Sequence, residues 1–163
     1  MDKINRSLAE LKSVGFEGFR RIGDLFLSCF DVPDASGIYL VLYLNEDHPK
    51  FVSEGVGGFF KGRNPNVSEF KLEENWVNDT IVIYIGQTED SLNRRITRYM
   101  DFGKGKPVGH YGGRYIWQIQ DYCSLVVCWK ACPEGFDSRK IEGEFMRRFK
   151  RIHGRLPFAN LRE

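Results

Sequence analysis

The stretch TIVIYIGQTEDSLNRRITRYM, residues 80–100, contains both kinds of element from which the fold can be predicted. Its first part is rich in isoleucine, valine and tyrosine, which predicts a strand over residues 80–85. Asp90 or Ser91 is a suitable N-cap for a helix that runs to about Met100. A strand followed closely by an amphipathic helix indicates a domain of mixed α and β structure.

Strand and helix signals continue on both sides of this stretch. Turn residues precede one apolar run, and a glycine-rich segment at residues 103–113 separates the central helix from the next runs. The last amphipathic run has Asp137 or Ser138 as a cap and is closed by Gly154. We therefore predict three further strands and a final helix, at residues 38–44, 115–119, 124–130 and 137–153. The chain is expected to form a single α+β domain.

Two segments are predicted to lie outside this core pattern. Apolar spacing in residues 1–35 indicates two short helices, interrupted near Gly15 and Gly18, and so a helical extension packed on the domain. The main domain is then residues 36–163. Within it, residues 45–79 are repeatedly interrupted by glycine and proline, and they are expected to be the least regular part of the chain.

Composition restricts the class of protein. The chain has 163 residues, of which 42% are hydrophobic and 28% are charged, as in ordinary globular domains. No apolar run approaches the length of a membrane span, and the first residues do not resemble a secretory signal. The four cysteines include no C-x-x-C pair, which argues against a zinc site. We expect a cytoplasmic protein without a membrane partner.

Positive charge is gathered in places, although the net charge is only +2. Phosphate binding needs local density of lysine and arginine rather than a high total. The alternative for Arg147, Arg148, Lys150 and Arg151 is that they only solvate the surface of a helix. The clusters are Arg94, Arg95 and Arg98, then Lys104, Lys106 and Arg114, and finally five basic residues within 147–155.

One carboxylate of the final helix is expected to face the core. At about 100° per residue, Glu142 falls in the sector that holds Phe145, Phe149 and Met146. Glu144 falls outside that sector. An unpaired charge on the core side is costly, so Glu142 needs a partner or a ligand.

The central helix contains a comparable arginine. Arg95 borders the apolar face of that helix, whereas Arg94 and Arg98 point away from it. One interpretation is a structural salt bridge between Arg95 and Glu142. The other is that Glu142 binds a divalent cation through oxygen while Arg95 binds a phosphate.

At these positions the sequence resembles the GIY-YIG nuclease superfamily. The family pattern is matched in order by Gly37-Ile38-Tyr39, Tyr84-Ile85-Gly86, Arg95, Glu142 and the tail Pro157-Phe158-Ala159-Asn160. Each element falls on a segment of the expected type. The resemblance covers about residues 36–161 and implies a small antiparallel β-sheet flanked by helices.

The resemblance also implies an activity, namely a metal-dependent endonuclease that hydrolyses phosphodiester bonds in DNA by a single-metal mechanism. It implies one divalent ion, Mg²⁺ or Mn²⁺, held by Glu142, and Arg95 neutralising charge on the phosphate. Tyr39 would lie near the attacking water as a base or the partner of a base, supported by Tyr84. Asn160 would orient the site. Because an ordinary tyrosine pKa of about 10 is too high for an efficient base, Tyr39 needs help from neighbouring groups.

The chain departs from the family pattern in two ways. The motifs of Tyr39 and Tyr84 are usually joined by a short connection in the family, so the resemblance implies that residues at about 45–79 are an insertion. Within it, Lys61 and Arg63 are candidates for phosphate contacts, although the insertion is equally well interpreted as a surface loop. Tyr99 stands where many members carry histidine. His110, in the glycine-rich segment, either replaces that histidine or lies on the surface. The candidate nucleic-acid-binding residues are Lys61, Arg63, His110 and Arg114.

Other functions remain open at this stage. The leading alternative is a non-catalytic nucleic-acid-binding module that retains the fold, and a purely structural interaction domain is more remote. DNA is the expected partner, with RNA still open. The sequence contains no separate DNA-reading module, so a homodimer or a larger complex is also compatible with it.

Overall fold

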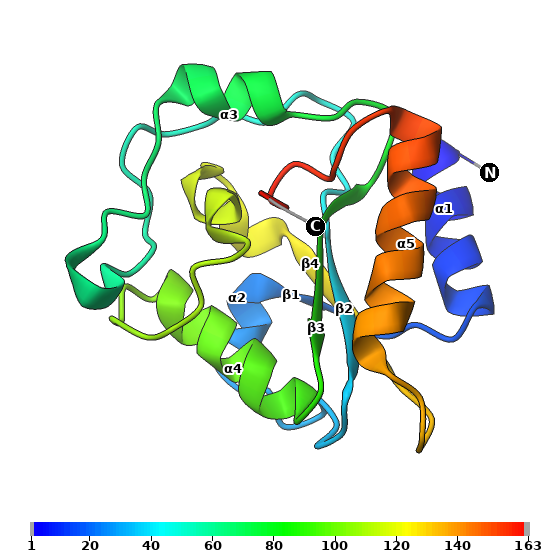
Figure 1. Cartoon of the computed structure of the whole chain (residues 1–163). Helices are drawn as coiled ribbons and strands as arrows, with labels where there is room; N and C mark the ends of the chain where they lie inside the picture. The colour runs from blue at the N-terminus through cyan, green and yellow to red at the C-terminus, as the bar shows by residue number, and fades with distance from the viewer. Residues whose placement is uncertain (1, 162–163) are drawn as a thin grey trace.

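A four-stranded antiparallel sheet lies at the centre of the computed structural model, which describes residues 2–161 (Figure 1). The strand order is β1–β4–β2–β3, so β3 forms one edge and β1 the other. The prediction of a single α+β domain with a small antiparallel sheet is confirmed. The strands are β1 (Glu17–Arg21), β2 (Gly37–Leu42), β3 (Val82–Thr88) and β4 (Val126–Ala131).

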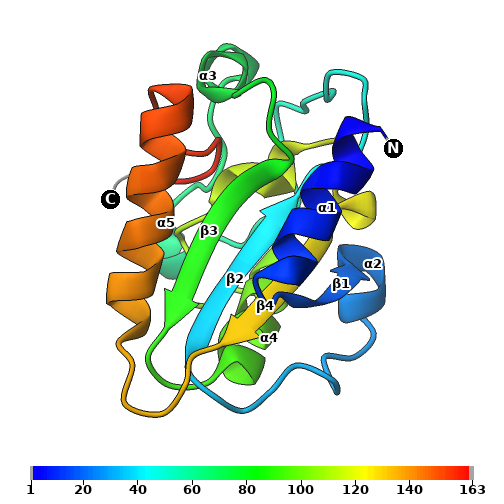
Figure 2. The same ribbon diagram turned by 90° about the vertical axis from the view of Figure 1, so that its right-hand side faces the viewer.

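Helices cover both faces of this sheet. α1 (Lys3–Ser13) and α5 (Ser138–His153) lie over one face (Figure 2), and α2 (Ile22–Leu25) and α4 (Leu92–Gly103) lie over the other. No helix within residues 2–161 is long and apolar enough to cross a membrane. The remaining helical segments are α3 (Glu69–Asn75) and the 3₁₀ turns η1 (Phe60–Gly62), η2 (Arg114–Gln118) and η3 (Tyr122–Ser124).

The central strand β2 explains why the sheet has two hydrophobic cores. All six of its residues are buried, as expected for an apolar run covered on both sides. Ile38, Leu40 and Leu42 pack in the core beneath α1 and α5. Tyr39 and Val41 pack in the larger core beneath α4. Alternation along one strand therefore places Tyr39 on the α4 side.

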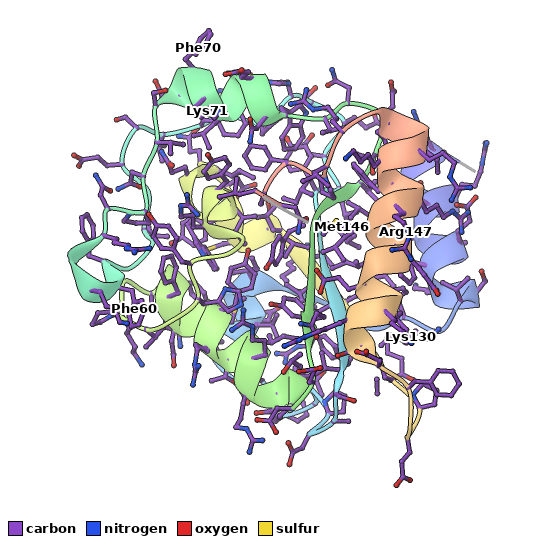
Figure 3. All side chains as sticks on the ribbon, in the orientation of Figure 1. Phe60, Phe70, Lys71, Lys130, Met146 and Arg147 are labelled. Atoms are coloured by element: carbon purple, nitrogen blue, oxygen red, sulfur yellow. The ribbon has the colours of Figure 1, made fainter. Side chains whose placement is uncertain are left out.

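The two long helices begin and end where the capping residues indicate. The Ser91 side chain accepts a hydrogen bond from the Arg94 amide at the start of α4. Asp137 does the same for Arg139 in α5, and Gly154 ends that helix in the left-handed conformation at φ 74°. On α5, Met146 is buried against the sheet while Arg147 is exposed (Figure 3).

The prediction of a purely helical N-terminal extension is wrong. After α1, residues 17–21 form the edge strand β1, which pairs with β4. The chain reverses through Gly15 at φ 100°, and Gly18 at φ 91° lies against the Trp129 ring, where a side chain would collide. The segment EGFRR has no clear alternation, and its strand state depends on the free backbone groups of β4.

The strand predicted at residues 115–119 is also wrong. This apolar run forms η2, and only Ile119 makes an isolated bridge, to Phe51. Apolar residues in this run are buried nearly continuously, so their spacing did not distinguish a strand from a helical turn.

The insertion is attached to the domain by a buried glutamine. Gln118 is 1% exposed, and its side-chain nitrogen donates to the carbonyl oxygens of Val52 and Val67 at 2.9 and 2.8 Å. Its side-chain oxygen accepts from the Val67 amide at 2.9 Å. Residues 45–79, for which no regular element was predicted before Trp76, contain η1 and α3. The insertion is therefore an ordered part of the domain.

Candidate active site

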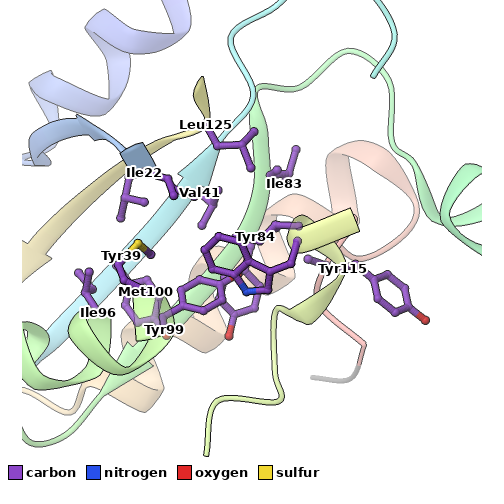
Figure 4. Packing of buried hydrophobic residues seen from close by; sticks show 14 of the residues in the cluster. Ile22, Tyr39, Val41, Ile83, Tyr84, Ile96, Tyr99, Met100, Tyr115 and Leu125 are labelled. Carbon is purple, nitrogen blue, oxygen red and sulfur yellow. The ribbon is translucent and has the colours of Figure 1, made fainter. Parts of the chain in front are cut away.

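Two tyrosines from neighbouring strands lie together on the α4 side of the sheet (Figure 4). Tyr39 comes from β2 and Tyr84 from the edge strand β3, and their ring centroids are 6.0 Å apart. The Tyr39 side chain is fully buried and Tyr84 is 6% exposed. Tyr99 of α4 completes the cluster, with its ring centroid 5.6 Å from that of Tyr84.

Gly86 makes room for the Tyr39 ring. The two residues are direct neighbours in the β2–β3 ladder. A Cβ atom on Gly86 would lie 2.3 Å from Tyr39 Cζ and 2.6 Å from the hydroxyl oxygen. No real Cβ makes such contacts, so glycine is required for the phenol to lie across β3 toward the edge of the sheet.

Replacing Gly86 by alanine should therefore destabilise the protein by about 1–3 kcal/mol, the usual cost of overpacking a filled core. Urea unfolding followed by circular dichroism measures this change. Gly143→Ala on α5 is the matched control: its Cβ would meet only the flexible end of Arg147, at 3.2 Å. Because alanine is the better helix former, this control should stabilise by about 0.5–1 kcal/mol. Equal effects of the two substitutions would contradict the assigned contact.

His110 is a buried partner of Tyr39, and the alternative that it lies on the surface is wrong. The side chain is 1% exposed, and its Nε2 atom lies 3.0 Å from the Tyr39 hydroxyl oxygen. Its Nδ1 atom lies 2.9 Å from the carbonyl oxygen of Gly112, which can only accept a hydrogen bond. Nδ1 therefore carries the proton. In the neutral ring Nε2 is then the acceptor, and the Tyr39 hydroxyl donates to it.

Burial controls the protonation of both groups. It lowers the pKa of His110 well below 6.5, and the positive charge of Arg95 lowers it further. Burial also raises the pKa of Tyr39, whereas Arg95 and the Tyr84 hydroxyl act in the opposite direction. The His110 ring stacks on Tyr99 at 4.0 Å with 9° between the planes. At neutral pH the pair is thus an uncharged phenol held against an uncharged imidazole.

The buried imidazole should make the protein sensitive to acid. The unfolded chain binds a proton at His110 at a higher pH than the folded protein, so stability is full above about 6.5 and falls as pH drops below it. The loss is at most about 1.4 kcal/mol per pH unit. His110→Gln, which keeps a hydrogen-bond acceptor, should flatten this dependence in thermal melts between pH 7 and pH 5. His153→Gln on α5 is the control, and an equally steep curve for His110→Gln would rule out this linkage.

Arg95 points from the first turn of α4 toward the two tyrosines. Its positive charge lowers the pKa of Tyr39, Tyr84 and His110. Its Nε atom is buried and has no hydrogen-bond partner. A buried donor that has no acceptor is costly. The Nε donor is thus available to an acceptor that residues 2–161 do not provide.

Glu142 approaches the same place from α5, around the edge strand β3. Its side chain is partly buried, whereas that of Glu144 is exposed. Burial raises the pKa of the Glu142 carboxyl, and the charges of Arg95 and Arg139 oppose the shift. Among the described residues, the carboxylate forms no hydrogen bond or ion pair. The interpretation of a direct Arg95–Glu142 salt bridge is therefore wrong, although the two side chains do interact electrostatically.

Glu142 is also the carboxylate available for a metal ion. Residues 2–161 contain no group of three histidine, cysteine or acidic side chains arranged to hold one. Mg²⁺ commonly keeps several water ligands and binds through one or two carboxylates together with substrate phosphate oxygens. A single partly buried and unpaired carboxylate fits that kind of site. It does not fit an all-protein metal cage.

Asn160 holds the edge strand in position. Its side-chain oxygen accepts from the Ile85 amide, and its side-chain nitrogen donates to the Ile85 carbonyl oxygen, both at 2.9 Å. The backbone amide of Ala159 also donates a hydrogen bond to β3, to the Ile83 carbonyl oxygen at 2.8 Å. The tail therefore satisfies the free side of β3 and sets the position of Tyr84. Both the oxygen and the nitrogen of the Asn160 side chain take part in this role.

The remaining predicted residues lie in and beside the insertion. Lys61 and Arg63 are exposed on and after η1, and the guanidiniums of Arg63 and Arg114 lie 6.0 and 3.9 Å from the centroid of the Tyr111 ring. The structure thus groups these three cations near the segment that carries His110. They do not reach the cluster formed by Tyr39, Arg95 and their neighbours.

Tyr99 belongs to the site, although it was not among the predicted site residues. Its hydroxyl donates to the Gly113 carbonyl oxygen at 2.7 Å, and its ring supports His110. The signal was present in the sequence, because Tyr99 follows Arg95 by four positions and so shares its side of the helix. Pairing with His110 depended on the fold of the glycine-rich segment.

Comparison with known proteins assigns no family, since no family model, no curated protein and no solved structure matches this chain.

Proposed function

We propose that this protein is a metal-dependent endonuclease that hydrolyses phosphodiester bonds in DNA. The observation that carries the proposal is the meeting of Arg95, Glu142 and the Tyr39–His110 pair at one edge of the sheet. These groups come from α5, α4, β2 and the segment before η2. A guanidinium with a free Nε donor, an unpaired carboxylate and a buried proton acceptor are groups that can serve phosphodiester hydrolysis. The order of the motifs in the sequence resembles the GIY-YIG pattern and supports the same reading.

Arg95 would bind the scissile phosphate. Its buried Nε donor has no partner, and a phosphate oxygen is an acceptor suited to the planar guanidinium. During attack, negative charge grows on the phosphate oxygens. A fixed guanidinium in a site of low dielectric stabilises that charge more than water does.

Glu142 would hold the divalent ion, Mg²⁺ or Mn²⁺, with water and phosphate oxygens as the other ligands. When bound, such an ion polarises the phosphate and stabilises the leaving oxygen. The carboxylate must be ionised to serve as a ligand. Because burial raises its pKa, metal binding should weaken in acid at a pH above 4.5, the ordinary value for the group.

Tyr39 and His110 would remove the proton of the attacking water. As the water gives its proton to the Tyr39 oxygen, the proton of Tyr39 moves to Nε2 of His110. The resulting hydroxide attacks phosphorus while the bond between phosphorus and the leaving ester oxygen breaks, and the leaving oxygen takes a proton from solvent water. His110 becomes an imidazolium, which burial and Arg95 disfavour in the free protein. The negative charge of a phosphate bound at Arg95 offsets that effect. Proton uptake by His110 is therefore coupled to the presence of substrate.

A plasmid cleavage assay tests the proposal. Supercoiled DNA should be nicked or linearised with Mg²⁺ or Mn²⁺ and left intact with excess EDTA. Activity should elute with the protein through a final size-exclusion column, which separates it from contaminating nucleases of other sizes. If several DNA substrates are bound but none is cut with either metal, a binding module that retains the fold is the better description.

A further inference from the structure

A patch formed by the insertion and by residues that follow His110 combines cations with an exposed aromatic ring. We call it the aromatic–cationic patch. It consists of Phe59, Lys61, Arg63, Tyr111 and Arg114.

The insertion is fixed to the segment that carries His110. Phe60, labelled in Figure 3, packs against the larger core, and a Cβ on Gly109 would lie 3.5 Å from its ring. The Tyr111 hydroxyl donates to the Asn64 carbonyl oxygen at 3.0 Å. The insertion therefore contacts both sequence neighbours of His110, Gly109 through Phe60 and Tyr111 through Asn64. A ligand held by the patch would lie next to the group that bonds Tyr39.

The three cations of the patch have no acidic partners. No ion pair joins any residue in the described range 2–161 to Lys61, Arg63 or Arg114. The two guanidiniums, those of Arg114 and Arg63, lie 3.9 and 6.0 Å from the centroid of the Tyr111 ring, so two positive charges are gathered around one aromatic side chain. Such an arrangement favours anionic groups spaced along a chain, as in a nucleic-acid backbone.

Phe59 adds a feature that phosphate binding does not need. Its side chain is 52% exposed, although it adjoins Phe60, which packs against the core. A phenylalanine ring cannot hydrogen-bond a phosphate or the edge of a base, but it can stack on the face of a base. Base faces are accessible where a duplex is interrupted by unpaired nucleotides. The ring is thus suited to a substrate that has lost pairing near the cut.

We propose that the aromatic–cationic patch binds DNA that carries an unpaired base beside the scissile phosphate. Phe59 stacks on that base, and Lys61, Arg63 and Arg114 bind the flanking phosphates. This inference rests on the proposed nuclease function and narrows its substrate class from any DNA to DNA with interrupted pairing.

Fluorescence anisotropy in EDTA tests this preference without cleavage. Two labelled probes are used, a fully paired duplex and the same duplex with a few unpaired thymines at its centre. The wild-type protein should bind the interrupted probe about tenfold more tightly, as expected for one stacked base. Phe59→Ala and Phe59→Leu should each reduce this ratio to below about twofold, because neither side chain offers an aromatic face. Arg63→Gln should weaken binding of both probes alike and lower the salt dependence by about one phosphate contact.

Phe70→Ala is the matched control. Phe70 is a 77% exposed phenylalanine that points outward from α3 (Figure 3), and its removal should leave the ratio unchanged. Equal wild-type affinity for the two probes, or an unchanged ratio in Phe59→Ala, would overturn the proposal. The measurement needs no metal and no hydrolysis. A preference without cleavage would contradict only the proposed nuclease activity, and cleavage without a preference would contradict only the patch.

Discussion

Glu142→Gln should reduce Mg²⁺-dependent DNA cleavage by about a thousandfold or more, the largest effect expected for any single substitution in this protein. Glutamine has nearly the same shape but lacks the charge that holds a divalent ion. The same substitution should slightly stabilise the metal-free protein at neutral pH, because burial disfavours the ionised carboxylate and raises its pKa. This opposite effect on stability separates loss of activity from loss of folding.

The sign of the stability change depends on pH. Above the folded pKa of Glu142 the wild-type protein carries a charge in an unfavourable place, and the variant does not. Below 4.5 the carboxyl is protonated in the folded and unfolded states alike, so the difference disappears. Thermal melts without metal should show Glu142→Gln slightly more stable than the wild-type protein at pH 7. Glu144→Gln, on the exposed side of the same helix, should change neither cleavage nor the melting temperature appreciably.

Metal binding supplies a second readout for this variant. An ion that binds only the folded state raises the melting temperature. Millimolar Mg²⁺ should therefore stabilise the wild-type protein and Glu144→Gln, and leave Glu142→Gln unchanged. Retention of cleavage by Glu142→Gln would exclude this carboxylate as the metal ligand.

Arg95→Lys should lower the turnover number by about a hundredfold or more, although the positive charge is kept. Lysine presents a point charge and lacks the planar set of donors, including the Nε that is buried and unsatisfied in the free protein. If Arg95 acts on charge that develops during attack, kcat falls while KM changes little. Steady-state kinetics on a labelled duplex separates the two quantities.

Arg94→Lys is the matched control for this substitution. Arg94 precedes Arg95 on α4 and is exposed. Its guanidinium forms an ion pair with Asp90, with an N–O distance of 2.6 Å, and this pair does not involve the tyrosine cluster. It should retain activity within about twofold, as surface ion pairs contribute little. A similar loss in both variants would indicate a general effect of positive charge on DNA binding. It would argue against a specific role of Arg95.

Much of the candidate site followed from local patterns. Helical phase distinguished Glu142 from Glu144, and the structure leaves the first partly buried and the second exposed. Capping residues located the starts of α4 and α5, where these side chains arise. The angular position of a residue around its helix does not predict its burial in every case, however. Ile152 shares the apolar sector of α5 and yet is 64% exposed, because direction on a helix does not reveal whether another element lies opposite.

The sequence by itself determined the α+β class, the long helices, the central strand and the direction in which Glu142 and Arg95 point. These features depend on caps and periodicity within a few residues along the chain. Only the tertiary structure decided that residues 17–21 form a strand, that residues 114–118 form a 3₁₀ turn, and that His110 is buried as the acceptor of Tyr39. That last bond joins positions 71 residues apart. Such contacts depend on how separate elements pack, and no local pattern encodes the packing of one element against another.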